Sequence, residues 1–156
     1  MSNGKFIVID GIDGCGKSTM VNLMADKLSK NGKVVSTAEP SQGPIGKVLR
    51  DFLKNKKISG EIDALLFAAD RLWHVDNVIK PALEENTTVI SDRYVGSSLA
   101  YQSAQKGCKN GVIDDWVREL NKFVIKPDLY IVLDIAPEDS LKRRDNFDEK
   151  FENIKF

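Results

Sequence analysis

The chain has 156 residues, 23 acidic and 23 basic side chains, and 42% hydrophobic residues. This length and composition predict one globular domain over residues 1–156 that buries about two-thirds of its unfolded surface. Zero net charge argues against nucleic acid as the main partner, and no apolar run is long enough to cross a membrane. Two cysteines fit neither a disulfide framework nor a metal cluster, and no signal peptide is visible, so we expect a cytoplasmic protein.

The first predicted elements are a short buried strand over residues 5–10 and an amphipathic helix over residues 20–28. The segment between them matches G-x-x-x-x-G-K-[ST], the pattern of a phosphate-binding loop, and consists of Gly11, Ile12, Asp13, Gly14, Cys15, Gly16, Lys17, Ser18 and Thr19. Glycines let backbone N–H groups converge on phosphate oxygens, and the helix directs its N-terminal partial positive charge at the same anion. Lys17 can reach the outer phosphates, and the Ser18 hydroxyl can bind Mg²⁺. The loop therefore predicts a nucleotide site.

The remaining pattern alternates strands with helices. Further strands are predicted over residues 33–37, 87–91 and 129–134, and helices over 45–53, 61–79, 95–105, 112–123 and from Pro137 onward. Ser59 is available to cap the long helix, and Pro81 should end or kink it. This alternation predicts an α/β fold with a parallel sheet and helices on both faces.

Four acidic side chains lie at or just beyond the ends of the predicted strands: Asp10, Glu39, Asp92 and Asp134. Ligands of parallel sheets bind at the carboxyl ends of the strands, so we expect these acids to form a shared rim around one site. Asp92 would lie on the Mg²⁺ side. Its neighbour Arg93, together with Arg71 on the long helix, indicates a second anion opposite the nucleotide. Two facing phosphate ligands are what phosphorylation of a nucleoside monophosphate requires.

Other interpretations of these residues remain open at this point. A GTPase would carry Asn-Lys-x-Asp, and the nearest match, Asn121-Lys122-Phe123-Val124, lacks the Asp. Phe67 by itself reads as a core residue, and Arg71 could pair with a neighbouring acid, Asp70 or Asp76, on the surface. Asp92 and Arg93 could form a local salt bridge. His74, the single histidine, reads as a satisfied helix residue, and Trp73 and Trp116 as packing residues.

Taken together, the motifs resemble the thymidylate kinase (dTMP kinase) family of P-loop nucleoside monophosphate kinases, over nearly the whole chain. The matching stretches are Phe6 to Thr19, Glu39-Pro40, Leu65 to Arg71, Ser91 to Gln102, and Leu129 to Glu138 running on to Arg143-Arg144. The resemblance implies transfer of the γ-phosphate of ATP to dTMP with Mg²⁺, giving dTDP and ADP, in dTTP biosynthesis. It also implies a homodimer.

The resemblance further implies a role for each matching residue. Phe67 would stack on the thymine, Arg71 would reach the base edge or acceptor phosphate, and Arg93 would hold that phosphate. Asp13 would lie near the sugar 3′-hydroxyl and help to fix the Mg²⁺ and phosphate geometry. The remaining substrate-binding residues would be Glu39, Pro40, Ser98, Tyr101 and Gln102, and Ser18 and Asp92 would hold the metal.

Three departures from the family pattern limit the transfer. Asp10 replaces the usual Glu, and Ser41-Gln42 replaces a glycine pair. Gly14 stands where some members carry a catalytic arginine, so the transition-state cation is expected from a lid over about residues 143–150, which contains Arg143, Arg144 and Lys150. The family pattern also has a final strand and helix after the lid, for which we find no counterpart. We therefore expect a truncated form, or an exposed apolar fourth strand that something else covers.

Two alternative functions remain from the sequence alone. One is a related monophosphate kinase with another base preference. The other is a nucleotide-binding module without turnover, against which the retention of Lys17, Arg93 and the lid arginines argues.

Overall fold

The computed structural model describes residues 4–54, 59–103 and 112–143. Strands β1 (Phe6–Gly11), β2 (Val34–Ala38), β3 (Thr88–Asp92) and β4 (Leu129–Leu133) form a parallel sheet in the order β2-β3-β1-β4. Central β1 pairs with β3, with Phe6 opposite Val89, and with β4, with Ile7 opposite Leu129. The predicted parallel sheet is confirmed, and each predicted strand boundary lies within about one residue of the observed one.

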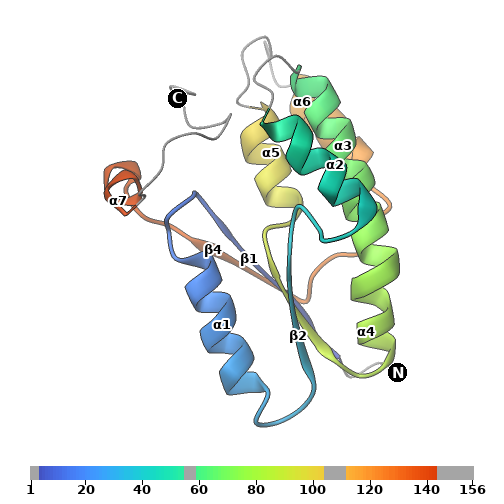
Figure 1. Ribbon diagram of the computed structural model, residues 1–156, viewed down its shortest axis with the longest axis vertical. Helices are drawn as coiled ribbons and strands as arrows, with labels where there is room; N and C mark the ends of the chain where they lie inside the picture. Colours follow the sequence, from blue (N-terminus) through green and yellow to red (C-terminus); the bar gives the residue numbers. More distant parts are fainter. Residues whose placement is uncertain (1–3, 55–58, 104–111, 144–156) are drawn as a thin grey trace.

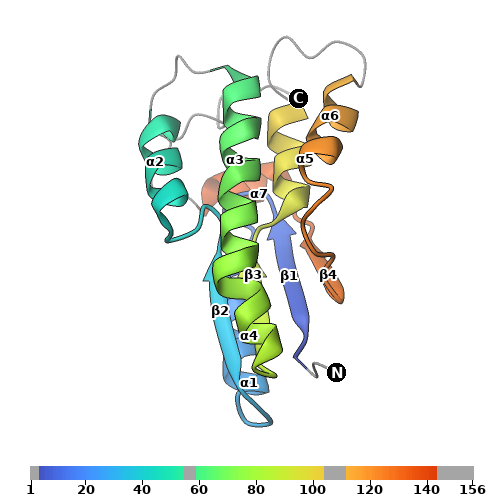
Figure 2. The same ribbon diagram turned by 90° about the vertical axis from the view of Figure 1, so that its right-hand side faces the viewer.

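Helices cover both faces of this sheet. The described helices are α1 (Lys17–Leu28), α2 (Pro44–Leu53), α3 (Gly60–His74), α4 (Lys80–Glu84), α5 (Val95–Ser103), α6 (Val112–Leu120) and α7 (Pro137–Lys142). Figure 1 shows α1 on one face and α3, α4 and α5 on the other. Turned by 90°, the molecule shows α2 lying beside α3, and α6 beside α5 (Figure 2).

The core is divided by the alternation of side chains along β1. Phe6 and Val8 point toward the long helix, where they pack with Val75, Ile79 and Tyr94. The intervening Ile7 and Ile9 point toward α1, in a cluster that also contains Val21 and Ile90. Because β1 is buried on both faces, it reads as a continuous apolar run rather than an alternating one. This double burial fixes the position of the loop that follows β1.

The long helix differs from the prediction in its C-terminal part. Ser59 caps it as expected, since its hydroxyl accepts a hydrogen bond from the Ile62 N–H at 3.4 Å. After His74 it passes through a π-helical turn, η1 (Val75–Ile79), and continues as α4 to Glu84, beyond Pro81. A wider turn just before a proline accommodates the missing N–H and the ring. Pro81 therefore does not end the helix, as the sequence suggested it could.

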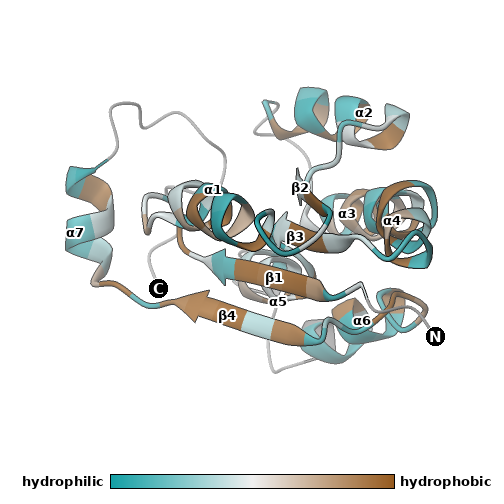
Figure 3. Cartoon of the chain, turned by 90° about the horizontal axis from the view of Figure 1, so that it is seen from below, coloured by the Kyte–Doolittle hydropathy of each residue, from teal (hydrophilic) through white to brown (hydrophobic). Residues whose placement is uncertain are grey.

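Strand β4 forms one edge of the described sheet. Three of its apolar side chains are exposed: Leu129 at 48%, Tyr130 at 38% and Val132 at 64%. Figure 3 shows β4 coloured as mostly hydrophobic beside β1. The described residues therefore include the exposed apolar edge that the sequence predicted. Among these residues, no helix is both long and apolar enough to span a lipid bilayer.

Candidate active site

The phosphate-binding loop joins the end of β1 to the start of α1. Gly14 and Gly16 adopt φ values of 77° and 101°, in the left-handed region where a glycine avoids the clash of a Cβ. Gly11 approaches β4 so closely that a Cβ there would lie 2.6 Å from the Leu133 carbonyl oxygen. These positions explain why the loop needs glycine and why it keeps a fixed place on the sheet.

Lys17 begins α1, and its side chain is buried at the mouth of the loop. Its ammonium group donates to the carbonyl oxygens of Gly11 at 3.0 Å and Ile12 at 2.8 Å, and lies 3.7 Å from Asp13 Oδ1. A buried ammonium held by neutral carbonyls can exchange them for phosphate oxygens, which carry more negative charge. Lys17 therefore lies at the loop with its ammonium group directed into it, and its binding of an anion stays a prediction.

Ser18 and Asp92 provide the groups that a magnesium ion would need. The Ser18 hydroxyl donates to Asp92 Oδ2 at 2.8 Å, and Asp92 Oδ1 is buried with no hydrogen-bond partner in the described part of the chain. Mg²⁺ prefers oxygen ligands and is usually held by one or two protein groups together with substrate phosphates and water. A hydroxyl beside a partnerless carboxylate oxygen fits that requirement, so the predicted pair suits the metal.

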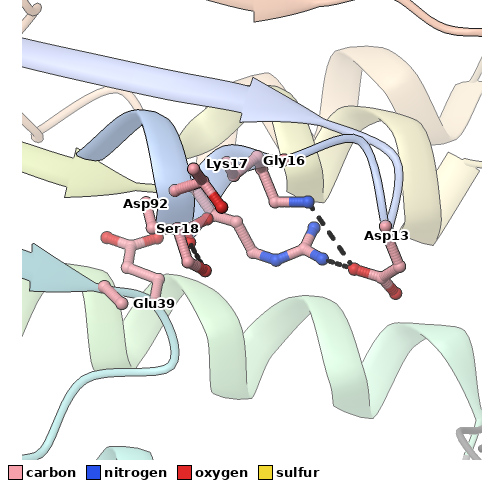
Figure 4. A pocket seen from close by; sticks show the side chains of 10 residues that line it. Asp13, Gly16, Lys17, Ser18, Glu39 and Asp92 are labelled. Atoms are coloured by element: carbon pink, nitrogen blue, oxygen red, sulfur yellow. Dashed lines mark hydrogen bonds and ion pairs between the residues drawn. The ribbon is translucent and has the colours of Figure 1, made fainter. Parts of the chain in front are cut away.

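A cavity of about 370 Å³ lies over the loop and the ends of β2 and β3. Figure 4 shows Lys17, Ser18, Glu39 and Asp92 converging on it, with Asp13 at one end. Its lining consists of Asp13, Gly14, Gly16, Lys17, Ser18, Thr19, Ala38, Glu39, Asp92 and Arg93. The cavity therefore combines the backbone groups of the loop and two cations, which suit an anion, with three carboxylates, of which Asp92 suits a metal ion.

Arg93 follows β3 directly and has a φ of 73°. Its guanidinium forms an ion pair with Asp13, donates to the Ser97 hydroxyl at 3.1 Å, and lies 5.4 Å from the centre of the Tyr101 ring. The salt bridge with its neighbour Asp92, an alternative from the sequence, is not the arrangement found; Asp92 is bound by Ser18 instead. Arg93 is thus held from two sides at the floor of the cavity.

A second, smaller cavity of about 70 Å³ adjoins the first. It is lined by Asp13, Pro40, Leu53, Phe67, Arg93, Ser97, Tyr101 and Gln102. Asp13 and Arg93 line both cavities, so the two spaces meet at this ion pair. Five of the predicted substrate-binding residues besides Asp13 lie in the smaller space: Pro40, Phe67, Arg93, Tyr101 and Gln102.

Two other predicted substrate-binding residues lie beneath these cavities. The guanidinium of Arg71 is 1% exposed and pairs with Glu39 at 2.7 Å, not with Asp70 or Asp76. It also donates to Asn121 Oδ1 at 2.6 Å and to Ser98 Oγ at 3.0 Å. Ser98 is likewise buried, while its neighbour Ser97 lines the smaller cavity. Direct ligand contacts of Arg71 and Ser98 therefore stay predictions.

Glu39 is the buried centre of a polar network under the site. Besides Arg71, it lies 3.3 Å from His74 Nδ1, and His74 Nε2 lies 2.7 Å from the Thr37 hydroxyl. His74 thus acts as the satisfied helix histidine that the sequence indicated. The neighbouring Ser41 bonds to Asp70 through its N–H and its hydroxyl, each at 2.6 Å. The loop that carries Pro40 is consequently tied to α3 at adjacent residues, Asp70 and Arg71.

The predicted rim of four acids is only half right. Glu39 and Asp92 line the main cavity. The Asp10 side chain points away from the main cavity and contacts α5 and β4. Asp134 follows β4 and is exposed to solvent. Asp10 belongs to β1 itself, and side chains alternate between the two faces of a strand. Its side chain therefore lies on the same face as Phe6 and Val8. The end of a strand in the sequence does not reveal which face its last side chain takes.

The predicted lid lies only partly within the described residues. The Ser140 hydroxyl donates to the carbonyl oxygen of Asp13, which brings α7 against the phosphate-binding loop. Arg143 follows at the C-terminal end of α7 and is exposed. Arg144, Lys150 and the remainder of the lid lie outside the described residues, as does Cys108. The position of Arg143 near the loop is compatible with a lid role, which stays a prediction.

Three residues that contact the candidate site were not predicted from the sequence: Ser97, Tyr130 and Asn121. Ser97 lies in the first turn of α5, and its hydroxyl accepts a hydrogen bond from Arg93, which precedes the helix with a φ of 73°; the sequence does not reveal this contact. Asn121 was considered only as part of a failed GTPase motif, yet it accepts a hydrogen bond from Arg71. Tyr130 gave no signal of its own, because its contact with Asp10 joins strands about 120 residues apart in sequence.

Comparisons with known proteins agree with this geometry. The thymidylate kinase family model matches residues 9–156. A probable thymidylate kinase from Thermococcus kodakarensis is 44% identical over 163 residues, covering 94% of this chain and 77% of the relative. Another from Pyrobaculum aerophilum is 43% identical, covering 97% of this chain and 76% of the relative.

Solved structures give the same result. Thymidylate kinase from Candida albicans superimposes with a TM-score of 0.83 at 31% identity, covering 96% of this chain and 71% of that chain. Thymidylate kinase from Ehrlichia chaffeensis gives a TM-score of 0.76 at 32% identity, covering 90% of this chain and 81% of the other.

Proposed function

Because the chain belongs to the thymidylate kinase family of nucleoside monophosphate kinases, we propose that it transfers the γ-phosphate of ATP to dTMP, giving dTDP and ADP. The larger cavity over the phosphate-binding loop would take the ATP phosphates, and the smaller one would take dTMP. This is a step of dTTP biosynthesis.

The observation that carries the proposal is the ion pair of Asp13 with Arg93, which lines both cavities. A phosphate held by Arg93 in the smaller cavity would face a γ-phosphate bound beside Lys17. Phosphoryl transfer needs such in-line positioning and charge stabilisation, with little covalent chemistry from the protein. Two adjoining cavities that share Arg93 would allow the donor and acceptor phosphates to face each other.

Residues of the donor side act mainly through charge and backbone geometry. Lys17 would bind the outer phosphates, while the loop from Gly11 to Thr19 would present its N–H groups to them. Mg²⁺ bound at Ser18 and Asp92 would neutralise charge on the donor phosphates. We propose Arg143 and Arg144 as the lid cations, because no loop arginine stands at Gly14.

The acceptor side would read the base. Phe67 and Tyr101 offer aromatic faces, and the buried Gln102 amide can pair with a base edge. Pro40 closes the same space from the loop after β2. Arg71 and Ser98 would support this wall from below, and a rearrangement on binding would be needed for either to contact the ligand.

The function is tested by a coupled ADP-release assay over dTMP, dUMP, dCMP, dGMP and dAMP, with and without Mg²⁺. The expected result is Mg²⁺-dependent turnover with the highest kcat/KM for dTMP. A preference for dCMP or a purine would assign the protein to a different monophosphate kinase. Binding of ATP and dTMP without any turnover would identify a nucleotide-binding module.

We further propose a cytoplasmic homodimer. Exposed apolar side chains occur on two helices that pack together: Val48 and Phe52 on α2, and Ile62 and Leu65 on α3. Burial of such side chains commonly drives association. Sedimentation equilibrium of the protein and of Leu65→Glu should show a dimer and a monomer, respectively. A monomeric wild type would reject the dimer without affecting the proposed reaction.

A further inference from the structure

We propose that Tyr130 and Asp10 form a positioning unit that acts through Ser97 to orient the guanidinium of Arg93. Asp10 contacts the phosphate-binding loop only through the backbone N–H of Gly11, among the contacts described here. Tyr130 and Asp10 line neither of the two cavities described above but a separate one of about 250 Å³. The inference rests on the proposed function, since it assigns Arg93 to the acceptor phosphate.

The Asp10 carboxylate collects hydrogen bonds from three elements. It is 5% exposed and accepts from the backbone N–H of Gly11 and of Ser97, each at 2.9 Å. The Ser97 hydroxyl donates to it at 2.6 Å, and the Tyr130 hydroxyl donates to the other oxygen. A buried carboxylate is costly unless its lone pairs are satisfied, and these four donors satisfy it. Asp10 thereby ties the ends of β1 and β4 to the first turn of α5.

Ser97 connects the Asp10 carboxylate to the guanidinium of Arg93. A hydroxyl has one hydrogen, which Ser97 gives to Asp10, so its lone pairs remain for the Arg93 Nη1 that lies 3.1 Å away. Arg93 in turn is paired with Asp13 on its other side. The direction of the guanidinium is therefore set by two partners, of which one is held by Asp10.

Tyr130 is arranged to keep this carboxylate in place. Its hydroxyl donates to Asp10 and accepts from the Gly96 N–H at 2.9 Å, so it joins β4 to α5 at the same point. Burial, with the nearby Asp10 charge, raises the pKa of Tyr130 well above its usual range, so the hydroxyl keeps its proton. A Cβ at position 96 would lie 2.2 Å from the Tyr130 hydroxyl, which explains the glycine there. A side chain at position 96 would therefore have to displace the Tyr130 hydroxyl.

The test compares Tyr130→Phe with Tyr94→Phe. Both remove a partly buried hydroxyl that makes a hydrogen bond, but Tyr94 donates to the Ile125 carbonyl oxygen at 3.0 Å, outside the unit. Tyr130→Phe should raise the KM for dTMP about three- to tenfold, the range expected for losing the hydrogen bond to Asp10, with the KM for ATP unchanged. The control should leave both KM values unchanged. Equal shifts in both KM values, or the same shift in the control, would overturn the proposal.

A double-mutant cycle with Ser97→Ala tests the route. If Tyr130 acts through Ser97, Tyr130→Phe should raise the dTMP KM no further once Ser97 is alanine. Additive effects would overturn the route, and so would a Tyr130→Phe variant with wild-type kinetics. Gly96→Ala, whose Cβ must displace the Tyr130 hydroxyl, provides a second perturbation should Tyr130→Phe fail to fold.

The positioning can also be measured without turnover. In ¹⁵N-arginine spectra of the ligand-free protein, the guanidinium signal assigned through Arg93→Lys should move in Tyr130→Phe and Ser97→Ala but not in Tyr94→Phe. An unmoved signal would overturn the unit. A wild type that does not phosphorylate dTMP would reject the proposed function, and the spectra would still decide on the positioning unit.

Discussion

The two halves of the candidate site are built differently. The donor half is centred on one continuous loop, residues 11–19, in which backbone groups and the start of α1 make the anion site. Residues at the ends of β2 and β3 add to its lining. The acceptor half is assembled from side chains of the loop after β2 and of α2, α3 and α5, with Arg93 after β3. Its geometry depends on buried contacts beneath it, at Arg71 and Asp10. The geometry of the donor half is therefore set mainly by a short stretch of sequence, and the geometry of the acceptor half by packing between distant segments.

The largest expected effect falls on the donor half. Lys17→Ala should lower kcat by several orders of magnitude, because stabilisation of charge on the transferred group is the main catalytic contribution in such enzymes. The melting temperature should change little, since Lys17 bonds to loop carbonyls and not to a core partner. Coupled ADP release with saturating dTMP measures the rate. Retention of wild-type kcat would show that Lys17 has another role.

The same substitution made at two arginines distinguishes the buried support of the acceptor half from its cavity lining. Arg71→Met should cost about 3–5 kcal/mol of unfolding free energy, because it leaves the Glu39 carboxylate buried without its partner. Arg93→Met should instead weaken dTMP binding by about 2–5 kcal/mol, with ATP affinity unchanged. Denaturant unfolding and calorimetric titration measure the two quantities. An unfolding free energy of Arg71→Met equal to that of the wild type would mean that Arg71 has no structural role. A larger loss of ATP affinity than of dTMP affinity in Arg93→Met would place Arg93 on the donor side.

The contrast also explains what the sequence could and could not predict. The loop, the strands and their parallel orientation follow from local patterns, because hydrophobic runs and glycine spacing act over a few residues. Phe67, Tyr101 and Gln102 could be named by resemblance, since each stands in a recognisable motif, and all three line the smaller cavity. Contacts between distant segments were not predictable. The turn of Asp10 toward β4 depends on the pleat of β1. That Ser97 lines the smaller cavity, while Ser98 is buried beside Arg71, depends on the phase of α5.

A smaller effect is expected at the wall of the acceptor cavity. Phe67→Ala should weaken dTMP binding by about 1–3 kcal/mol, as expected for loss of a stacked aromatic ring against a base. Phe123→Ala is the matched control, because Phe123 is 72% exposed and lines neither cavity. Titration with dTMP and with ATP measures both sites. Equal losses in the two variants would mean that Phe67 contributes packing and no recognition.

The smallest expected effect concerns the start of β1, at the opposite end of the strand from the site. Asp128 Oδ2 accepts a hydrogen bond from the Phe6 N–H at 2.8 Å, and Oδ1 lies 3.2 Å from Lys5 Nζ. The backbone hydrogen bond, aided by Lys5, holds the pKa of Asp128 below its usual range. A lowered pKa means that the carboxylate stabilises the fold above about pH 4 and loses this contribution as the pH falls through the folded-state value.

Asp128→Ala should therefore lower the unfolding free energy by about 1 kcal/mol at neutral pH, since the pair is exposed to solvent and one backbone hydrogen bond dominates. The difference from the wild type should shrink as the pH is lowered, and kcat at neutral pH should stay unchanged because Asp128 lines neither cavity. Denaturant unfolding at neutral and acidic pH provides the check. Asp128→Asn should show the same loss of pH dependence while keeping an acceptor for the Phe6 N–H. If the difference in unfolding free energy instead grew toward acidic pH, the protonated carboxyl group of Asp128 would stabilise the fold more than its carboxylate does.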